Sequence, residues 1–429
     1  MDLKYSPEDI KEIINSESYI SVLDEIKSES FVLVLPTGFG KTYIIAIYLL
    51  KLLNKEAKGL FLTPTNILTN QQYELFKELT NYNVKRIYPT DDTFPDLNQA
   101  DIFFTTIHLA NSRKTKQNLN KYDFIVFDEI HNFCTGEIYD ELFRNFKGKI
   151  IGLSATVFKK TRSYLLDIRK DIQFVDRTSK KKENIIISYI PTLLVDSQIL
   201  ILNKLAFYLR KNLPFENLLT LFNKNSLQVS DLLTLPSSYQ RMRLIHYLLA
   251  YFYLSSQIPS TYNNFIKKYF NKLEIEKLSD FSDNYTKIEV IINFLKNNFN
   301  EKTIIFAEYI ETINQISKSL NKEGLEHTLL IGKSNKNSNQ IKALNEFKDK
   351  VKILLTTKVG EEGLDIGDAY NLIFFEPIVN KRRIIQRIGR IGRRNPEGNI
   401  LILGYKNTLE DRRANLLLNF LAKDEIKSQ

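Results

Sequence analysis

The chain has 429 residues, with 60 Lys and Arg against 50 Asp and Glu, a formal net charge of +10 and a pI near 9.2. This length allows two or three domains with cores of their own, and the basic excess favours polyanionic partners without requiring one. One cysteine, Cys134, excludes internal disulfides and cysteine-cluster metal sites, and the lack of a long apolar stretch or a signal-peptide core predicts a cytoplasmic protein that does not cross a membrane.

The first part of the chain alternates between strand and helix patterns. Strands are expected at 31–35, 59–63, 101–105, 123–127 and 149–153, with helical stretches between them. Such alternation is typical of a parallel sheet covered by helices on both faces. We therefore predict an α/β domain over residues 1–172.

A glycine-containing loop, PTGFGKT, connects the first strand to a helix expected at 43–53. Glycines let the backbone turn and approach phosphates, and the start of the helix attracts negative charge. In this loop Lys41 is expected to reach the β and γ phosphates of ATP, and Thr42 to bind Mg²⁺, although Leu35 replaces the first glycine of the common pattern. The candidate nucleotide-binding residues of the loop are Thr37, Gly38, Gly40, Lys41 and Thr42.

The segment DEIH follows the apolar run at 124–127, which is predicted to be a buried strand. Carboxylates at the carboxyl end of a parallel strand face the ligand crevice. Asp128 is therefore expected to hold Mg²⁺, and Glu129 to orient and deprotonate the attacking water. The alternative for an isolated pair is an ordinary acidic turn; the preceding phosphate loop favours the catalytic interpretation.

Residues 173–285 differ from the alternating pattern. A charged run at 180–182 is suited to a connection, and the sequence from about Pro191 to Leu278 has long helical periodicity with almost no glycine. This segment is predicted to be an all-helical insertion. Its interleaved aromatic and basic residues fit either nucleic-acid stacking or the core of a helix pair, and the core is favoured. They are Tyr239, Arg241, Arg243, His246, Tyr247, Tyr251 and Tyr253. Lys267 and Lys268 are expected on a solvated face.

Alternation returns over residues 286–429, with strands expected at 302–306, 351–356, 371–375 and 399–403. This predicts a second parallel-sheet domain. In its loop KVGEEGLDI, Asp365 is positioned to reach a ribose hydroxyl or the opposing domain, unless the loop is simply acidic.

Near the end of this domain, KRRIIQRIGRIGRR places Arg383, Arg387, Arg390 and Arg394 on one face if it is helical, beside an apolar stripe. The face could bind phosphate backbones by charge alone. The phosphate loop upstream favours a sharper interpretation, in which Arg390 and Arg393 act as arginine fingers on the transferring phosphoryl group.

These segments resemble the motifs of superfamily 2 helicases, in particular the helicase part of archaeal Hef and its FANCM relatives. The matching segments are PTGFGKT, LTPTNILTNQ at 62–71, DEIH, GLSAT at 152–156, IIFAEYIET at 304–312, TTKVGEEGLDI at 356–366 and FFEPIVNKRRIIQRIGRIGR at 374–393. The resemblance implies two RecA-like lobes that bind ATP and Mg²⁺, with a thumb-like helical domain between them.

Further roles follow only from this resemblance. Gln386, Arg390 and Arg393 would meet ATP from the second lobe, Ser154 and Thr156 would couple hydrolysis to lobe movement, and Thr65 and Thr356 would contact the strand backbone. The nuclease motif that Hef carries in a further domain is not found in the sequence. No nuclease activity is expected.

Three functions remain open. The first is an ATP-dependent DNA helicase or translocase acting on branched or forked DNA, moving 3′ to 5′ as the resemblance implies. The second is an RNA helicase, because a motor that grips the sugar-phosphate backbone does not reveal its sugar in these motifs. The third is a non-unwinding switch or a motor subunit of a larger complex. DNA is favoured over RNA, and a nuclease or replication and repair factors are possible protein partners.

Overall fold

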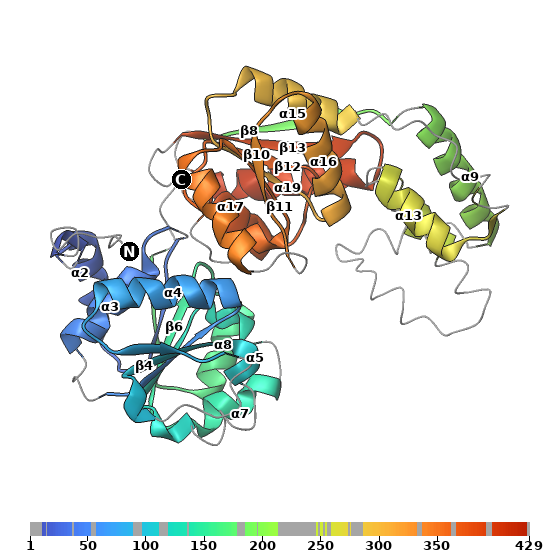
Figure 1. The fold of residues 1–429 in the computed structure, drawn as a ribbon. Helices are drawn as coiled ribbons and strands as arrows, with labels where there is room; N and C mark the ends of the chain where they lie inside the picture. The colour runs from blue at the N-terminus through green and yellow to red at the C-terminus, as the bar shows by residue number, and fades with distance from the viewer. Residues whose placement is uncertain are drawn as a thin grey trace. The chain divides into compact units, whose positions relative to one another are not determined.

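The structure is a computed structural model (Figure 1) that describes residues 11–13, 15–36, 38–52, 57–88, 97–110, 119–134, 137–177, 185–194, 196–212, 246–247, 249–251, 254, 259–272, 275, 286–332, 337–361, 366–391 and 397–426. The chain divides into two compact units. Unit 1 comprises Met1–Lys180 and Glu361–Asp365, and unit 2 comprises Lys181–Gly360 and Ile366–Gln429.

Unit 1 contains a seven-stranded parallel sheet in the order β3-β4-β2-β5-β6-β1-β7. The strands are β1 (Phe31–Val34), β2 (Gly59–Thr63), β3 (Val84–Arg86), β4 (Ile102–Thr106), β5 (Phe124–Phe127), β6 (Lys149–Ser154) and β7 (Gln173–Asp176). All five predicted strands are confirmed. The two edge strands, β3 and β7, were not predicted, because short half-exposed segments such as VKR and QFVD lack the apolar run of a buried strand.

Helices cover both faces of this sheet, with α3 and α4 on one side and α7 and α8 on the other (Figure 1). They are α2 (Glu17–Leu23), α3 (Lys41–Leu52), α4 (Asn66–Leu79), α5 (Ile107–Ala110), α7 (Glu137–Asn145) and α8 (Lys159–Ile168), with short 3₁₀ turns η1 (Leu97–Gln99), η2 (Leu119–Lys121) and η3 (Ile130–Asn132). Alternate residues of each strand enter opposite cores: Phe31 and Leu33 pack with α3 and α4, and Val32 and Val34 pack with α7 and α8. The predicted two-sided α/β domain is confirmed.

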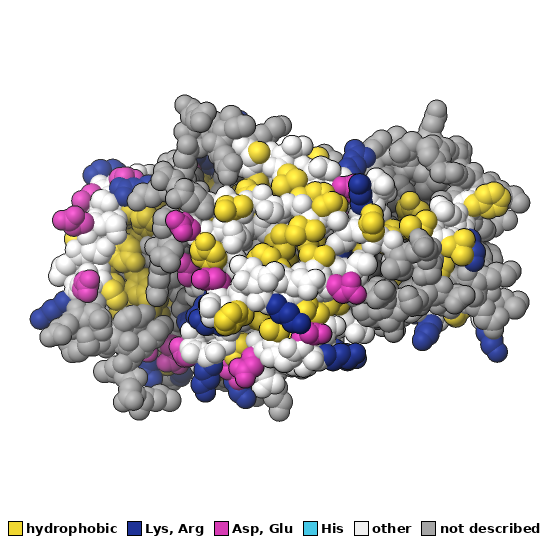
Figure 2. Space-filling view, turned by 90° about the horizontal axis from the view of Figure 1, so that it is seen from above, with side chains coloured by type: hydrophobic (Ala, Val, Ile, Leu, Met, Phe, Trp, Pro, Cys, Tyr) yellow, Lys and Arg dark blue, Asp and Glu magenta, His cyan; other side chains and the backbone are white. Residues whose placement is uncertain are grey.

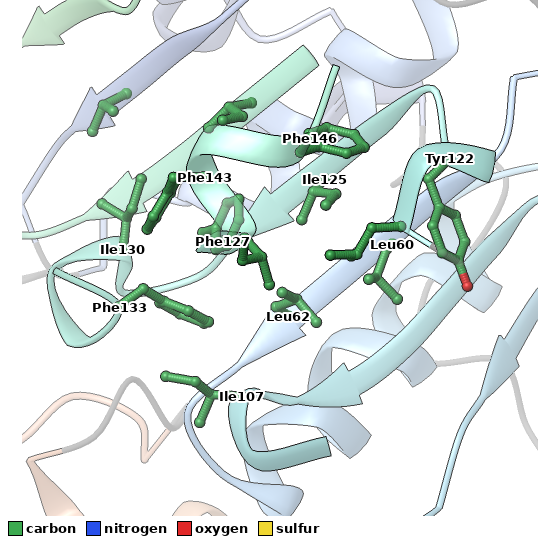
Figure 3. Close-up of a cluster of buried hydrophobic side chains, with 14 of the residues drawn as sticks. Leu60, Leu62, Ile107, Tyr122, Ile125, Phe127, Ile130, Phe133, Phe143 and Phe146 are labelled. Atoms are coloured by element: carbon green, nitrogen blue, oxygen red, sulfur yellow. The ribbon is translucent and has the colours of Figure 1, made fainter. Parts of the chain in front are cut away.

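One of these cores fixes the turn after β5 (Figure 3). Phe127 stacks on Phe143, with ring centroids 4.8 Å apart, and meets Phe133 edge to face at 4.9 Å. Ile130 and Phe133 are both fully buried. Because apolar side chains on both sides of Asp128 and Glu129 are packed into the core, the backbone of that pair is held in place.

Unit 2 contains a six-stranded parallel sheet in the order β10-β11-β9-β12-β13-β8. Its strands are β8 (Ile185–Thr192), β9 (Thr303–Phe306), β10 (His327–Leu330), β11 (Ile353–Thr356), β12 (Asn371–Phe374) and β13 (Gly398–Tyr405). Its helical elements around this sheet are α15 (Thr286–Asn297), α16 (Ile310–Lys322), α17 (Asn337–Asp349), η4 (Lys358–Gly360), α18 (Lys381–Ile388) and α19 (Leu409–Ile426). The four predicted strands are confirmed, so the chain has the two parallel-sheet domains expected.

The predicted boundaries of the middle segment need correction. β7 pairs with β1, so the first sheet extends past residue 172. β8 pairs with β13 along its whole length, so the second sheet begins before the helical insertion. β8 was not recognised as a strand because it lies at a sheet edge and is half-exposed, with Ile186 64% exposed.

The described part of the insertion consists mainly of α9 (Asp196–Asn212) and α13 (Pro259–Tyr269), which share a small core. Tyr247 and Tyr262 are buried in that core, which supports the structural interpretation of the insertion's tyrosines. Lys267 and Lys268 are exposed, as expected. Tyr239, Arg241, Arg243 and Tyr253 lie outside the described residues.

On the surface drawn in Figure 2, basic and acidic side chains of the described residues are interspersed and do not gather in one patch. The basic excess of the chain is therefore not concentrated on this face. Among the described residues, no helix combines the length and apolar character needed to cross a membrane.

Candidate nucleotide-binding site

The loop between β1 and α3 requires glycine at two positions. Gly38 and Gly40 have φ values of 83° and 89°, a region that side-chain-bearing residues rarely adopt. A Cβ atom at Gly40 would also lie 2.4 Å from the hydroxyl oxygen of Tyr19 on α2. The positive φ therefore demands glycine at position 40, and a side chain there would also displace the end of the Tyr19 side chain. Thr37, the other predicted loop residue, lies outside the described residues.

Lys41 and Thr42 are the first two residues of α3, which begins two residues before the predicted start. Backbone N–H groups in the first helical turn have no partner within the helix, so they can bind an anion. Lys41 Nζ donates to the carbonyl oxygens of Leu35 at 3.1 Å and Pro36 at 3.4 Å. Leu35 itself is fully buried in the core, which accounts for a leucine where the common loop pattern has glycine.

Asp128 follows β5 directly and is 5% exposed. Its Oδ1 accepts a hydrogen bond from the Glu129 N–H at 3.0 Å, and its Oδ2 accepts one from Gln72 Nε2 at 3.2 Å. Burial, followed by the charge of Glu129, raises the pKa of Asp128 to about 7, and the charge of Lys41 opposes this rise. Lys41 and Asp128 thus act on each other within unit 1, as a phosphate site requires.

Glu129 has a left-handed backbone with φ 51° and ψ 53°. This conformation costs about 1–2 kcal/mol in a residue with a side chain. The Glu129 carboxylate is 3% exposed, and its Oε2 lies 3.3 Å from His131 Nδ1 and 3.5 Å from Ser154 Oγ. The strained turn therefore directs a buried carboxylate toward the end of β6.

His131 and Ser154 join the turn after β5 to the end of β6. His131 Nδ1 and Ser154 Oγ are 2.7 Å apart, and both side chains are buried. Ser154 Oγ also donates to the Thr156 carbonyl at 2.8 Å, and the Thr156 N–H donates back at 3.2 Å. Ser154, one of the two predicted coupling residues, thus contacts the DEIH segment, and Thr156, the other, is hydrogen-bonded to Ser154. His131 was not predicted to form this link.

The donor set fits Mg²⁺. Among the described residues there is no group of three or more His, Cys, Asp or Glu side chains that could hold a metal ion. Mg²⁺ at phosphoryl-transfer sites needs only one or two protein ligands, because substrate phosphates and water supply the rest. The Asp128 carboxylate and the Thr42 hydroxyl, which is adjacent to Lys41, match that requirement.

Two polar residues of α4 also bear on the site. Thr65 is the N-cap of α4, and its hydroxyl accepts from the Leu68 N–H at 3.4 Å. Gln72, which is 7% exposed, makes the contact to Asp128 described above. Sequence reasoning missed Gln72, although a glutamine on the buried face of an amphipathic helix, between Leu68 and Phe76, could have marked it.

The arginine-rich segment of unit 2 differs from the predicted basic face. α18 ends at Ile388, so Arg390 lies beyond the helix, and both Arg387 and Arg390 are buried, at 0% and 1% exposure. Arg387 packs over the rings of Phe306 and Phe374, at 4.7 and 5.4 Å from their centroids. Gln386 is also buried, at 9% exposure. Arg393, Arg394 and Asp365 lie outside the described residues.

Glu308 pairs with two of these arginines. Arg383 binds the carboxylate through two nitrogens, at 2.8 and 2.6 Å, and Arg387 binds Oε1. Burial opposes ionisation of Glu308, but the hydrogen bond from Arg383 and the charges of Arg387 and Arg383 outweigh it and lower its pKa to about 2. Buried charges are stable when they are paired in this way. Arg387 is therefore a structural anchor of α18.

Thr356 is fully buried at the end of β11, and its hydroxyl donates to the Leu330 carbonyl at 2.8 Å. A Cβ atom at Gly360 would meet this hydroxyl at 2.6 Å. Such burial argues against direct contact between the Thr356 side chain and a nucleic-acid strand. Thr356 instead anchors the start of the loop that follows β11.

Glu376 provides a pH-dependent prediction. Its carboxyl is 4% exposed, and Oε2 accepts from the Glu308 N–H at 3.0 Å. Burial, with the charges of Glu308 and Glu410 acting against Lys287, raises its pKa from 4.5 to about 8. The folded protein therefore binds this proton more tightly than the unfolded chain does, and stability should fall as pH rises from about 4.5 to about 8.

Replacement of Glu376 by glutamine should flatten that slope. The amide keeps an acceptor for the Glu308 N–H but has no proton to lose. Urea unfolding at pH 5, 6.5 and 8 checks this by comparing the free energies of unfolding of the wild type and Glu376→Gln. Parallel pH dependences of the two proteins would contradict the assignment.

Two family models match the chain. The model described as "Type III restriction enzyme, res subunit" matches residues 4–159, and "Helicase conserved C-terminal domain" matches residues 286–395. A protein of Methanocaldococcus jannaschii named as an ATP-dependent RNA helicase is 24% identical over 450 aligned positions, covering 88% of this chain and 56% of that protein. The ATP-dependent DNA helicase mph1 of Neurospora crassa is 32% identical over 144 positions, covering 30% of this chain and 12% of that protein.

The crystal structure of the Pyrococcus furiosus Hef helicase domain shares the fold, with a TM-score of 0.59 and 22% identity, covering 92% of this chain and 96% of that one. The two matched models fall on the two parallel-sheet domains, the first on the sheet domain with the phosphate loop and the DEIH segment and the second on the sheet domain with the arginine-rich segment. In both matched domains the chain resembles superfamily 2 helicases, among them the Hef, Mph1 and FANCM helicases. It spans about half the length of the Methanocaldococcus relative and a smaller share of the Neurospora one.

Proposed function

We propose that this chain couples hydrolysis of ATP to movement along nucleic acid. The observation that carries the proposal is that two buried carboxylates, Asp128 and Glu129, follow the end of β5 in the same parallel sheet whose strand β1 leads into the loop with Lys41, and that the charge of Lys41 lowers the pKa of Asp128. Phosphoryl transfer needs a positive charge on the phosphates, a metal ligand and a base for water, and these side chains supply them.

In this mechanism the start of α3 binds the phosphates through its N–H groups and through Lys41. Thr42 and Asp128 would hold Mg²⁺, which would supply positive charge to the phosphate oxygens. Glu129 accepts the proton of the attacking water. Ser154, at the end of β6, is bonded to His131 and Thr156. A change in the protonation of Glu129 would therefore alter the hydrogen bonds at the end of β6, and hydrolysis would affect the conformation of the lobe in this way.

The second lobe completes the site in this proposal. From the resemblance to the helicases we infer that Gln386, Arg390 and Arg393 would act on the same ATP, and that the two arginines would stabilise the charge on the transferring phosphoryl group. This role requires Gln386 and Arg390, which are 9% and 1% exposed in unit 2, to become accessible. Asp365 reaches the ribose. Closure of the two lobes on ATP and reopening after hydrolysis would move the bound strand, which Thr65 contacts at the start of α4. The helical insertion would hold branched nucleic acid beside the motor.

DNA is the favoured substrate. The Neurospora relative is named as an ATP-dependent DNA helicase. Forked DNA and 3′ to 5′ movement are proposed from the resemblance to that family, as are a nuclease or repair factors as partners. The Methanocaldococcus relative, named as an RNA helicase, supports RNA as a second candidate substrate.

Strand separation tests the substrate and the direction. A labelled duplex with one single-stranded arm should separate when ATP and Mg²⁺ are present and the arm is a 3′ DNA tail. A duplex with a 5′ DNA tail, or with a 3′ RNA tail, should be separated more slowly than the duplex with the 3′ DNA tail. Preference for the RNA tail would replace DNA by RNA in the proposal. Hydrolysis of ATP without separation of any duplex would favour a switch or a translocating subunit that needs a partner.

A further inference from the structure

Gln72 lies at the junction of α4 and the predicted metal ligand. Its side chain is 7% exposed, and Nε2 donates to Asp128 Oδ2 at 3.2 Å. The other carboxylate oxygen, Oδ1, accepts from the Glu129 N–H at 3.0 Å. Each oxygen thus has one protein donor and keeps lone pairs for a further ligand. The two hydrogen bonds together fix the plane of the carboxylate, and Gln72 supplies the one that comes from outside the DEIH turn.

The N-terminal turn of α4 is bonded to the ends of two strands. Thr63 Oγ1, at the end of β2, lies 2.6 Å from Thr69 Oγ1 and donates to the Thr65 carbonyl at 3.1 Å. Arg86, at the end of β3, donates to Asn70 Oδ1 at 2.8 Å and to the Asn66 carbonyl at 3.1 Å. These bonds connect the first turn of α4 to the ends of β2 and β3.

The same helix carries the proposed strand contact and the bond to the metal ligand. Thr65 caps its first turn, and Gln72 lies seven residues further on, about 10 Å along a helix with a rise of about 1.5 Å per residue. A shift or rotation of α4 at Thr65 would change the distance between Gln72 Nε2 and Asp128 Oδ2. A hydrogen bond is sensitive to such changes, because it weakens steeply with distance and angle.

We propose that Gln72 is a positioning residue that holds the Asp128 carboxylate for Mg²⁺, and that a nucleic-acid strand bound at the first turn of α4 acts on the ATP site through this bond. The second half of the inference rests on the proposed function. The first half requires only that Asp128 binds the metal of the nucleotide complex.

The positioning role is tested by Gln72→Leu in the full chain, with Gln340→Leu as the matched control. Gln340 is 5% exposed and donates to the Ile331 carbonyl at 2.6 Å in unit 2, so the control also removes one buried amide hydrogen bond. Affinity for Mn²⁺ in the presence of nucleotide, measured by electron paramagnetic resonance, should fall about 10-fold or more in Gln72→Leu, as is usual when a partner of a metal ligand is removed.

Gln340→Leu should leave the affinity for Mn²⁺ unchanged. Its Tm should fall by about as much as the Tm of Gln72→Leu. Equal Mn²⁺ affinities of the wild type and Gln72→Leu would overturn the positioning role. An equal loss of affinity in Gln340→Leu would assign the effect to general destabilisation and overturn it as well.

A double-mutant cycle with Thr65→Val tests the route from nucleic acid. The quantity measured is the ratio of ATPase rates with and without polynucleotide. Each single substitution should lower this ratio. In a protein that already carries Gln72→Leu, Thr65→Val should lower it little further, because both substitutions interrupt the same connection from the bound strand through α4 to Asp128. Independent, multiplicative effects would overturn the route. If no polynucleotide stimulates the wild type, the proposed function fails, while the Mn²⁺ affinities still decide the positioning role.

Discussion

Glu129→Gln should lower the rate of ATP hydrolysis by about 10²- to 10⁴-fold, the range expected for loss of a positioned general base. The amide keeps the shape of the carboxylate and can remain in the buried pocket formed with His131 and Ser154. It cannot accept the proton of the attacking water. Binding of ATP and Mg²⁺ should be retained, because Lys41, Thr42 and Asp128 are unchanged.

Single-turnover hydrolysis, together with equilibrium binding of a fluorescent ATP analogue, separates the two effects. Lys41→Ala is the informative comparison, because it should weaken binding itself by removing the charge on the phosphates. The pattern expected is therefore binding without turnover in Glu129→Gln and weakened binding in Lys41→Ala. Wild-type turnover by Glu129→Gln would show that another group is the base.

Arg390→Ala should reduce the rate of ATP hydrolysis by about 10³-fold or more, the effect expected of a lost arginine finger. The reason is that Arg390 would stabilise charge that develops only in the transition state, so binding of ATP through the loop after β1 should largely survive. Strand separation should be lost with hydrolysis. Steady-state ATPase rates and nucleotide affinity measure the two quantities.

Lys381→Ala is the matched control for charge. Lys381 is exposed at the start of α18. Its replacement by alanine removes one positive charge from the same segment, as Arg390→Ala does. It should alter salt-dependent affinity for nucleic acid slightly and leave ATP hydrolysis near the wild-type rate. If Arg390→Ala instead hydrolyses ATP near the wild-type rate, as Lys381→Ala should, then Arg390 is not an arginine finger.

Central strands could be predicted from sequence more closely than edge strands. β2 has the predicted bounds of 59–63 because every one of its residues is buried, which makes a continuous apolar run. β10 alternates between buried and partly exposed residues, and β8 is partly or fully exposed at every residue but its last. Such segments are ambiguous when each strand is considered alone. Only pairing with β13 and β11 shows that they belong to the second sheet.

The same division applies to the candidate site. Lys41, Asp128 and Glu129 were predictable because each follows directly on a buried strand or its loop, where local pattern determines position. The contact of Gln72 with Asp128 joins residues 56 positions apart, and the contact of Arg387 with Glu308 joins residues 79 apart. Such pairs depend on how helices pack on the sheet, which local periodicity does not specify.

The rate of ATP hydrolysis by the purified chain with Mg²⁺, measured with single-stranded DNA, forked DNA, duplex DNA, RNA or no polynucleotide, tests the central claim most directly. At least one DNA should raise the rate well above the rate without polynucleotide, and the same DNA should fail to do so for Glu129→Gln. Hydrolysis that is the same with and without every polynucleotide would contradict a nucleic-acid motor and favour a nucleotide-dependent switch.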